Sequence, residues 1–262
     1  MERLNQVKLL VEMLLDEMPN IRSQVEDVPN TLAAQRQLLR ALMNIRPPMP
    51  LKSSFVALQD KLLQSEVVEK GIVTLDETIK ISSNIRLWQG DITRLQVDAI
   101  VNAANSALLG CFVPGHRCID NEIHSAAGLQ LRNACAKIMQ EQGHEEPTGQ
   151  AKITDAFNLP SKFVIHTVGP IIPLNRQPNT DEEKLLASCY KSCLNLAVER
   201  NLKSIAFCCI STGEFHFPNR RAAEIAVDTV NQFVSNNDIT VLFNTFKDID
   251  MDIYKSTLMS AN

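Results

Sequence analysis

The sequence lacks several features that would place it in common classes of protein. No apolar run is long enough to span a bilayer, and the first 20 residues lack the charged start, apolar centre and small-residue cleavage site of a secretory signal. Positive charge is not in excess: 26 Lys and Arg stand beside 30 Asp and Glu, so the net charge is −4 and no broad basic surface is available for a phosphate backbone. We therefore expect binding to neither membranes nor nucleic acids.

The cysteines are few and unevenly placed. There are seven, an odd number at irregular spacings in a chain without an export signal, so we expect reduced thiols and not a disulfide framework. This pattern indicates a cytoplasmic protein. Hydrophobic residues make up 45% and charged residues 21% of the 262 residues, which is typical of a folded chain with one α/β domain plus an appendage, or with two small domains.

The first 75 residues have the pattern of amphipathic helices. Apolar residues recur at helical spacing over 3–17 and again over 32–45. The segment RPPMP at 46–50 cannot continue a helix, and a third helix is expected over 53–70, with Gly71 suited to its end. We therefore predict a helical N-terminal region over 1–75.

From residue 85 the pattern changes to short, apolar, β-branched runs separated by helical patterns. The expected strands are IRLWQGD, VDAIVNAAN, FVIHTVG, SIAFCCIST and ITVLFNTF. Strands that are apolar along both faces indicate a mainly parallel sheet covered by helices on each side. Two helix starts are marked, by a capping box over Thr180–Glu183 and by an N-cap at Asn219. Residues 76–262 are thus predicted to form an α/β domain.

Ligands of open α/β sheets bind at the carboxyl ends of the strands, so the loops that follow the strands are the place to seek function. Three such loops carry polar or small residues: Gly90 and Asp91, then Asn102 and Asn105, then Ser211, Thr212 and Gly213. In the third loop, hydroxyl and backbone N–H groups ahead of a helix start are suited to an anionic phosphate. The alternative is an ordinary strand-to-helix turn.

The stretch LLGCFVPGHRCIDN at 108–121 contains Cys111, His116 and Cys118 in the pattern C-x4-H-x-C. Two thiolates and an imidazole are ligands that zinc favours, and three protein ligands leave one tetrahedral position open, as in catalytic sites. Small buried cysteines without a metal are one alternative. A closed site that recruits His124 or Cys135 from a following helix, or a residue further off, is another.

Asp120 and His124 lie one helical turn apart, so they share a face if the helix includes Asp120. Asp120 is also a natural N-cap, so capping alone is one role for this residue. For His124 we expect a hydrogen bond that holds the loop within the fold rather than a role as an acid or base.

Five short motifs occur in the order GDIT, VDAIVNAAN, IDNEIHSAAG, VIHTVGP and STGEFHFP. Over about residues 83–260 they resemble the macrodomain, a module that binds ADP-ribose. With its cysteine–histidine–cysteine loop and its helical N-terminus, the chain resembles the bacterial zinc-containing branch, whose members are protein-ADP-ribose hydrolases. The resemblance implies a three-layer α/β/α fold with a mixed, mostly parallel sheet, and Zn²⁺ held by Cys111, His116 and Cys118.

The resemblance also implies roles for the strand-end residues. Those expected to contact ADP-ribose are Gly90, Asp91, Ile92, Asn102, Asn105, Ser211, Thr212, Gly213, Glu214 and Phe215. Asp91 would accept a hydrogen bond from the adenine amino group and Ile92 would offer its backbone N–H, while residues 211–215 would hold the diphosphate. Asn102 is alternatively a residue that ties down its own loop. Asn105 and Asp120 would be catalytic, with Asn105 at the distal ribose and Asp120 assisting the attack of water.

Three further side chains enter the comparison with the family. Phe215 would lie over the phosphates and distal ribose and Phe246 would stack on adenine, with core packing as the alternative for both. His216 departs from the glycine that is common at this point of the family's phosphate loop. This departure puts the loop's backbone freedom in doubt.

Taken together, these features predict a zinc-dependent hydrolase that removes mono-ADP-ribose from modified proteins, at acidic side chains. Water would attack either the ribosyl carbon or an acyl carbon, and the sequence does not choose between them. The alternatives are a non-catalytic ADP-ribose reader, an O-acyl-ADP-ribose esterase and a zinc-stabilised interaction protein. The target protein and the oligomeric state are left open.

Overall fold

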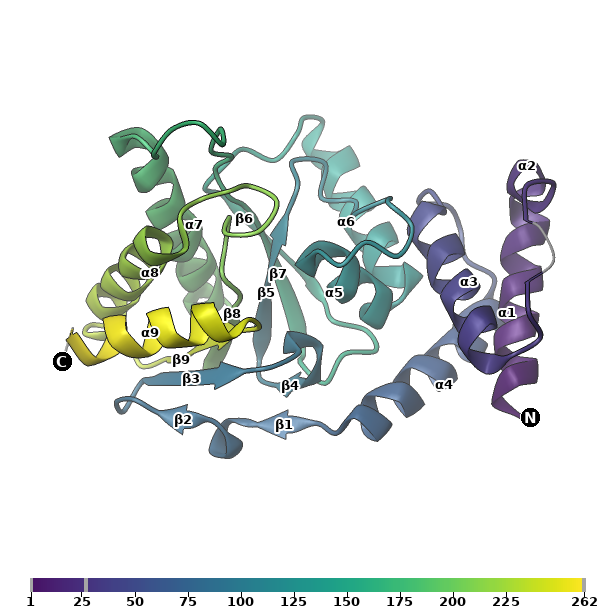
Figure 1. Ribbon diagram of the computed structural model, residues 1–262, viewed down its shortest axis with the longest axis horizontal. Helices are drawn as coiled ribbons and strands as arrows, with labels where there is room; N and C mark the ends of the chain where they lie inside the picture. The colour runs from purple at the N-terminus through teal and green to yellow at the C-terminus, as the bar shows by residue number, and fades with distance from the viewer. Residues whose placement is uncertain (1, 26–27, 261–262) are drawn as a thin grey trace.

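The computed structural model describes residues 2–25 and 28–260 of the chain. It begins with the predicted N-terminal helices, which lie to one side of the sheet in Figure 1. They are α1 (Arg3–Glu17), the short α2 (Pro19–Arg22), α3 (Leu32–Ile45) and α4 (Ser53–Lys70). The three helices expected over 3–17, 32–45 and 53–70 are confirmed. Gly71 follows α4 with a φ of 81°, a left-handed conformation that favours glycine at a helix end.

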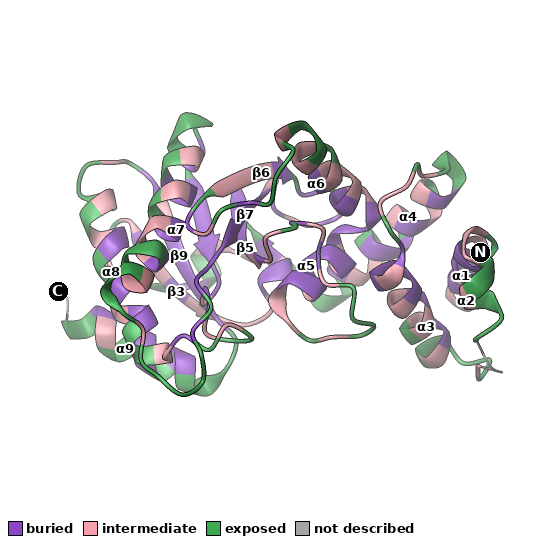
Figure 2. Cartoon of the chain, turned by 90° about the horizontal axis from the view of Figure 1, so that it is seen from above, coloured by how far each residue is buried: buried purple, intermediate pink, exposed green. Residues whose placement is uncertain are grey.

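The N-terminal helices have a hydrophobic core of their own. Its buried residues are Val7, Leu10, Val11, Leu14, Leu15, Leu39, Leu42, Met43, Phe55, Leu62 and Leu63, with Leu129 from the second part of the chain. A second, larger cluster extends from Val73 to Leu258 and contains the sheet. Figure 2 colours buried residues purple, both in the N-terminal helices and in the strands of the sheet. Leu129 therefore connects the two parts through apolar contact, and the division at residue 75 stays a prediction.

The sheet is mixed and mostly parallel. In the described residues its strand order is β2-β3-β9-β8-β5-β7-β6. The parallel centre consists of β3 (Ile85–Gln89), β9 (Thr240–Thr245), β8 (Ser204–Phe207), β5 (Ala99–Ala104) and β7 (Phe163–Val168). The antiparallel edges are β2 (Ile79–Lys80) and β6 (Ala151–Asp155), and β1 (Val73–Thr74) pairs separately with β4 (Leu95–Gln96). Two short 3-10 turns, η1 (Leu75–Glu77) and η2 (Ile92–Arg94), complete this region.

Helices cover both faces of the sheet, as the three-layer prediction requires. On one side α7 (Thr180–Glu199), α8 (Asn219–Val234) and α9 (Asp248–Ser260) pack against one another. On the other side α5 (Ile119–Ala127) and α6 (Leu129–Gln142) lie between the sheet and the N-terminal helices (Figures 1 and 2). The layer of α5 and α6 therefore contacts both the sheet and α3.

The capping box predicted over Thr180–Glu183 is wrong by one residue. The N-cap of α7 is Asn179, whose Oδ1 accepts from the N–H groups of Asp181 and Glu182, while the Glu182 carboxylate accepts from the Asn179 N–H. The side-chain amide oxygen of asparagine accepts from the first turn as readily as a threonine hydroxyl does. From the sequence, Asn179 and Thr180 are therefore both suitable N-caps for α7.

The N-cap predicted at Asn219 is also wrong. Asn219 is the first residue of α8, and Pro218 stands at the N-cap without a side-chain hydrogen bond. The amide of Asn219 donates instead to the Asp250 carboxylate of α9, at 2.6 Å between Nδ2 and Oδ1. The side chain of Asn219 therefore bonds to a residue that is distant in the sequence, which the local pattern cannot predict.

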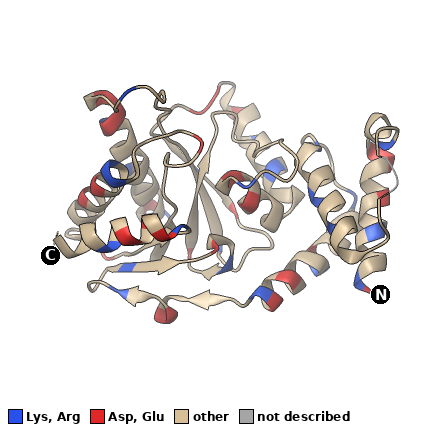
Figure 3. Ribbon diagram, in the orientation of Figure 1, with Lys and Arg blue, Asp and Glu red and all other residues tan. Residues whose placement is uncertain are grey.

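Charged residues of both signs are mixed along the outer helices (Figure 3), in keeping with the net charge of −4.

All seven cysteines are free. Among the described residues, no helix combines the length and apolar character needed to cross a bilayer.

Candidate functional site

The loops that follow the parallel strands meet at one end of the sheet. The loop from 105 to 118 follows β5, and the loop from 208 to 218 follows β8. They approach each other where the His116 Nε2 lies 3.7 Å from the Glu214 Oε1. The Phe215 carbonyl also accepts a hydrogen bond of 2.8 Å from the N–H of Ile172, in the loop after β7. The expected nucleotide loop and the expected metal loop are therefore neighbours.

Cys111, His116 and Cys118 come together as a group. One ligand atom from each lies within 4.8 Å of the other two, and the Cys111 Sγ is 3.6 Å from the His116 Nδ1. All three are half-buried. Gly110, just before the group, has a φ of 79°, and a Cβ there would come within 2.8 Å of the His124 ring. The start of this loop thus requires glycine for two reasons, conformation and close packing.

The donor set fits zinc. Two thiols and an imidazole are soft and borderline ligands, and within the described residues no further histidine, cysteine or carboxylate joins the three. Burial raises the pKa of Cys118 to about 12, with the neighbouring Cys111 acting in the same direction. Without a cation this thiol is protonated at neutral pH, so metal ligation requires release of its proton.

His124 and Cys135 do not join this loop. With His166 they form a separate, fully buried group whose ligand atoms lie within 4.8 Å of one another. The hydrogen bond expected for His124 is wrong: neither ring nitrogen has a hydrogen-bond partner. The ring lies where a Cβ on Gly110 would collide with it, so it supports the loop by packing. Burial, followed by the charges of His166 and Arg132, keeps the pKa of His124 well below its usual value, so the ring is neutral.

Asp120 is not the N-cap of α5. The helix begins at Ile119, and the N-cap is Cys118, whose sulfur accepts from the Asn121 N–H at 3.4 Å. Asp120 is buried, and its two oxygens accept from Asn102 Nδ2 at 2.7 Å and from Asn105 Nδ2 at 3.3 Å. Burial raises the pKa of Asp120 to about 6, against the opposing effect of the hydrogen bond from Asn102. This arrangement holds a carboxylate in a defined position near the Cys111–Cys118 loop.

Asn102 is held from a neighbouring strand. It is opposite His166 in the parallel register of β5 and β7, and its Nδ2 lies 3.2 Å from the His166 Nδ1. Burial lowers the pKa of His166 to about 4, so the ring is neutral and its Nδ1 accepts this hydrogen bond. The His166 Nε2 lies 3.0 Å from the Thr154 hydroxyl oxygen. Sequence reasoning gave His166 no role, although it stands within VIHTVGP, one of the five motifs.

Asn105 is more exposed than Asn102 and spans its own loop. Its Nδ2 also donates to the Gly110 carbonyl at 3.2 Å, and its Oδ1 accepts from the Ala107 N–H at 3.1 Å. These contacts hold the amide beside the Asp120 carboxylate. The structure therefore brings the two predicted catalytic residues into direct contact.

Asp91 lies on a different loop, after β3, together with Gly90 and Ile92. One carboxylate oxygen of Asp91 accepts from the N–H of Thr93 at 3.0 Å and from its hydroxyl at 2.6 Å. The other oxygen lies 3.6 Å from the Lys70 Nζ at the end of α4. Asp91 is thus the N-cap of η2, as a turn residue at a strand end would be.

The phenylalanines expected near the nucleotide differ in exposure. Phe246, after β9, is 74% exposed, so the core-packing alternative is wrong for this residue. Phe215 is half-buried in the loop after β8. An aromatic ring left this open at a strand end is available for stacking.

The loop after β8 offers several hydrogen-bond donors. Ser211 has a φ of 65° and a buried hydroxyl oxygen without a hydrogen-bond partner. Within the described residues, the backbone N–H groups of Gly213, Glu214 and Phe215 donate to no protein acceptor, whereas Thr212 bonds back to Cys209. Successive free N–H groups in a turn form an anion-binding concavity.

His216, which departs from the glycine common in the family, has a φ of 56°. It therefore takes up the left-handed conformation that glycine would adopt, and this loop conformation is reached without glycine.

This fold and this arrangement of loops define a macrodomain. The Macro domain family model matches residues 101–226. A structure of a variant of the Oceanobacillus iheyensis macrodomain with ADPR is 40% identical, with a TM-score of 0.63, and covers 70% of this chain and 97% of its own. The similarity extends further in two curated relatives. A protein-ADP-ribose hydrolase of Treponema medium is 51% identical over 95% of this chain and 96% of its own length.

A protein-ADP-ribose hydrolase of Staphylococcus aureus (strain MRSA252) is 46% identical over 97% of both chains. The chain therefore belongs to the protein-ADP-ribose hydrolase family and is a hydrolase. Both alignments cover at least 95% of this chain, so they include most of its N-terminal helical region.

Proposed function

We propose that this hydrolase removes mono-ADP-ribose from acidic side chains of modified proteins and that it requires zinc. The observation that carries the proposal is the position of Asp120. Its buried carboxylate is held by Asn102 and Asn105 and lies two residues from the last member of the Cys111–Cys118 loop. A carboxylate held in this way next to a candidate metal site suits hydrolysis, and a module that only bound ADP-ribose would not require it.

The proposed pose follows the loops at the strand ends. Adenine lies at Gly90, Asp91 and Ile92, with Phe246 free to stack on it. The diphosphate lies on the turn formed by Ser211, Thr212, Gly213, Glu214 and Phe215. The free N–H groups of this turn and the unpartnered Ser211 hydroxyl support this assignment. The distal ribose lies between Asn105 and the metal loop, and the modified side chain points outward.

Cys111, His116 and Cys118 would hold the zinc ion. When bound, it would act as a Lewis acid toward an oxygen of the distal ribose or of the leaving group, or would lower the pKa of a water molecule toward about 7.

Asp120 is the proposed general base. It takes a proton from water as the water oxygen attacks the carbon of the ester linkage, and Asn102 and Asn105 hold the carboxylate in place. The bond between that carbon and the linking oxygen breaks, and the leaving oxygen takes up a proton. The products are free ADP-ribose and the unmodified carboxyl side chain. Attack at the ribosyl carbon and attack at the acyl carbon give the same products.

Release of ADP-ribose from defined substrates tests this proposal. The metal-replete protein, a chelated sample and Cys118→Ala are incubated with proteins carrying mono-ADP-ribose on acidic or on other side chains. We expect release only by the metal-replete protein and only from acidic linkages. Release by Cys118→Ala at the parental rate would exclude the metal role, and release from other linkages alone would exclude the substrate class. In ¹⁸O-water the label enters ADP-ribose after ribosyl attack and the protein carboxyl group after acyl attack.

A further inference from the structure

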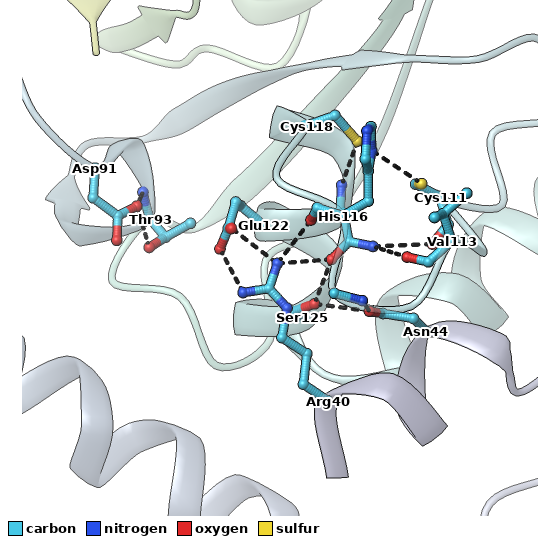
Figure 4. Close-up of polar contacts among 12 residues, drawn as sticks. Arg40, Asn44, Asp91, Thr93, Cys111, Val113, His116, Cys118, Glu122 and Ser125 are labelled. Atoms are coloured by element: carbon cyan, nitrogen blue, oxygen red, sulfur yellow. Dashed lines mark hydrogen bonds and ion pairs between the residues drawn. The ribbon is translucent and has the colours of Figure 1, made fainter. Parts of the chain in front are cut away.

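We propose that helix α3 of the N-terminal region is part of the metal site, with Arg40 and Asn44 as positioning residues for the Cys111–Cys118 loop. This inference rests on the zinc site of the proposed function. Neither residue belongs to the α/β part of the chain, and neither is a candidate metal ligand. Figure 4 shows both side chains extending from α3 toward the loop.

Arg40 connects α3 to the loop through its guanidinium group. Its Nη1 and Nη2 donate to the Glu122 carboxylate at 3.1 and 2.8 Å. Its Nη2 also donates to the backbone carbonyl of His116 at 3.0 Å and to the Asn121 side-chain oxygen at 2.8 Å. The paired contact with Glu122 sets the orientation of the planar guanidinium. One candidate ligand, His116, is therefore held directly through its backbone.

Asn121 carries the contact to the two cysteines. Its side chain is fully buried, and its Nδ2 donates to the carbonyls of Cys111 at 3.3 Å and Val113 at 3.0 Å. Its backbone N–H donates to the Cys118 sulfur at 3.4 Å. All three candidate ligands are thus reached from Arg40, either directly or through Asn121.

Asn44 holds the tip of the same loop. It is buried, and its Oδ1 accepts from the Gly115 N–H at 2.9 Å. Its Nδ2 donates to the Ser125 hydroxyl, which in turn donates to Asn121 at 3.2 Å. Gly115 has a φ of 64° and nothing within 4 Å of a Cβ position, so no side chain packs there. At Gly115 the loop is instead held by the hydrogen bond to Asn44 of α3.

The loop has little apolar burial of its own to hold it. Phe112 is 39% exposed and Val113 is 57% exposed. We therefore infer that the hydrogen bonds from α3 help to order the three candidate ligands in the metal-free protein. Residues that orient metal ligands typically alter affinity about 10–100-fold when they are mutated.

The test compares two arginines of α3 in the full-length chain. Arg40→Ala removes the contacts with the loop. Arg36→Ala is the matched control, because Arg36 lies one helical turn earlier and pairs with Glu66 of α4, within the N-terminal helices. Zinc affinity is measured by equilibrium competition with a chromophoric chelator. We expect Arg40→Ala to bind zinc about 10–100-fold more weakly than the parent protein, and Arg36→Ala to bind it within about 2-fold. Excess zinc should restore kcat in Arg40→Ala but not in Cys118→Ala.

A third variant covers the case in which Arg40→Ala does not fold. Arg40→Lys keeps the positive charge and the apolar stem but lacks the planar fork that contacts Glu122 and His116 together. Its zinc affinity should therefore lie between that of the parent protein and that of Arg40→Ala. Equal zinc affinity in the parent, Arg40→Lys and Arg40→Ala would overturn the inference alone. An equal loss in Arg36→Ala would overturn it too, because the effect would then come from the general stability of α3. If the parent protein itself bound no zinc, the proposed metal function would fail and this inference with it.

Discussion

Replacing Arg132 with methionine should weaken the docking of the N-terminal helices on the sheet-containing part of the chain. The Arg132 side chain is almost fully buried in α6. Its Nε donates to the Leu109 carbonyl at 2.7 Å, and its Nη1 donates to the carbonyls of Met43 at 2.8 Å and Arg46 at 2.6 Å. Methionine keeps most of the apolar volume and removes all three donors.

The magnitude follows from the three carbonyls left without this donor. A hydrogen bond from a charged donor contributes about 1.5–3 kcal/mol. The lower end applies here, because burial of the guanidinium is itself unfavourable and lowers the pKa of Arg132 to about 10. At about 1.5 kcal/mol for each of the three carbonyls, Arg132→Met should lower the free energy of unfolding by about 4–5 kcal/mol. For a chain of this size the unfolding temperature should fall by roughly 8–20 °C.

Urea unfolding followed by circular dichroism measures this change. The control is Arg200→Met, at an exposed position after α7, which should change the free energy by no more than about 0.5 kcal/mol. Since the N-terminal helices have their own apolar cluster, the Arg132→Met curve should also broaden or split into two transitions. A single transition at the parental midpoint would refute the reasoning, because it would show that the three hydrogen bonds contribute nothing net.

Three further changes have defined outcomes. Asp120→Asn should lower kcat by about 10²–10⁴-fold while ADP-ribose affinity, measured by calorimetry, changes only a few-fold; parental kcat would exclude the general-base role. Gly110→Ala should destabilise the protein by about 1–2 kcal/mol in thermal unfolding, because the φ of 79° is unfavourable for alanine and its Cβ would meet the His124 ring; an unchanged melting temperature would contradict this. Phe246→Ala should weaken ADP-ribose binding by about 3–10-fold with an unchanged melting temperature, since the ring is 74% exposed; unaltered affinity would place adenine elsewhere.

The elements that the sequence predicted well are those whose signal is local. The helices over 3–17, 32–45 and 53–70 show apolar periodicity and end at prolines or glycine, and the central strands are apolar on both faces. The strands that were missed are short or lie at the sheet edges. β6, for example, has the sequence AKITD and only one buried residue, so its pattern is weaker than that of a central strand.

The candidate site divides in the same way. Cys111, His116 and Cys118 lie within eight residues, so a single loop conformation can bring their donor atoms together. For this reason the spacing of the three residues was enough to predict the candidate metal site. His166 supports Asn102 across 64 residues, through the register of two parallel strands. A partner at that separation is set by topology and cannot be predicted from the spacing of residues.

The contacts between α3 and the metal loop depend on how the N-terminal helices dock. Adjacent residues of α3 serve the two purposes: the Met43 carbonyl accepts from Arg132, and the Asn44 side chain accepts from the Gly115 N–H. A shift of this end of α3 that breaks one contact must disturb the other, because consecutive residues of a helix move together. Arg132 also holds the Leu109 carbonyl at the entry to the loop. The docking of the N-terminal helices and the order of the metal loop are therefore coupled, and Arg132→Met should weaken zinc binding in proportion to the loss of docking.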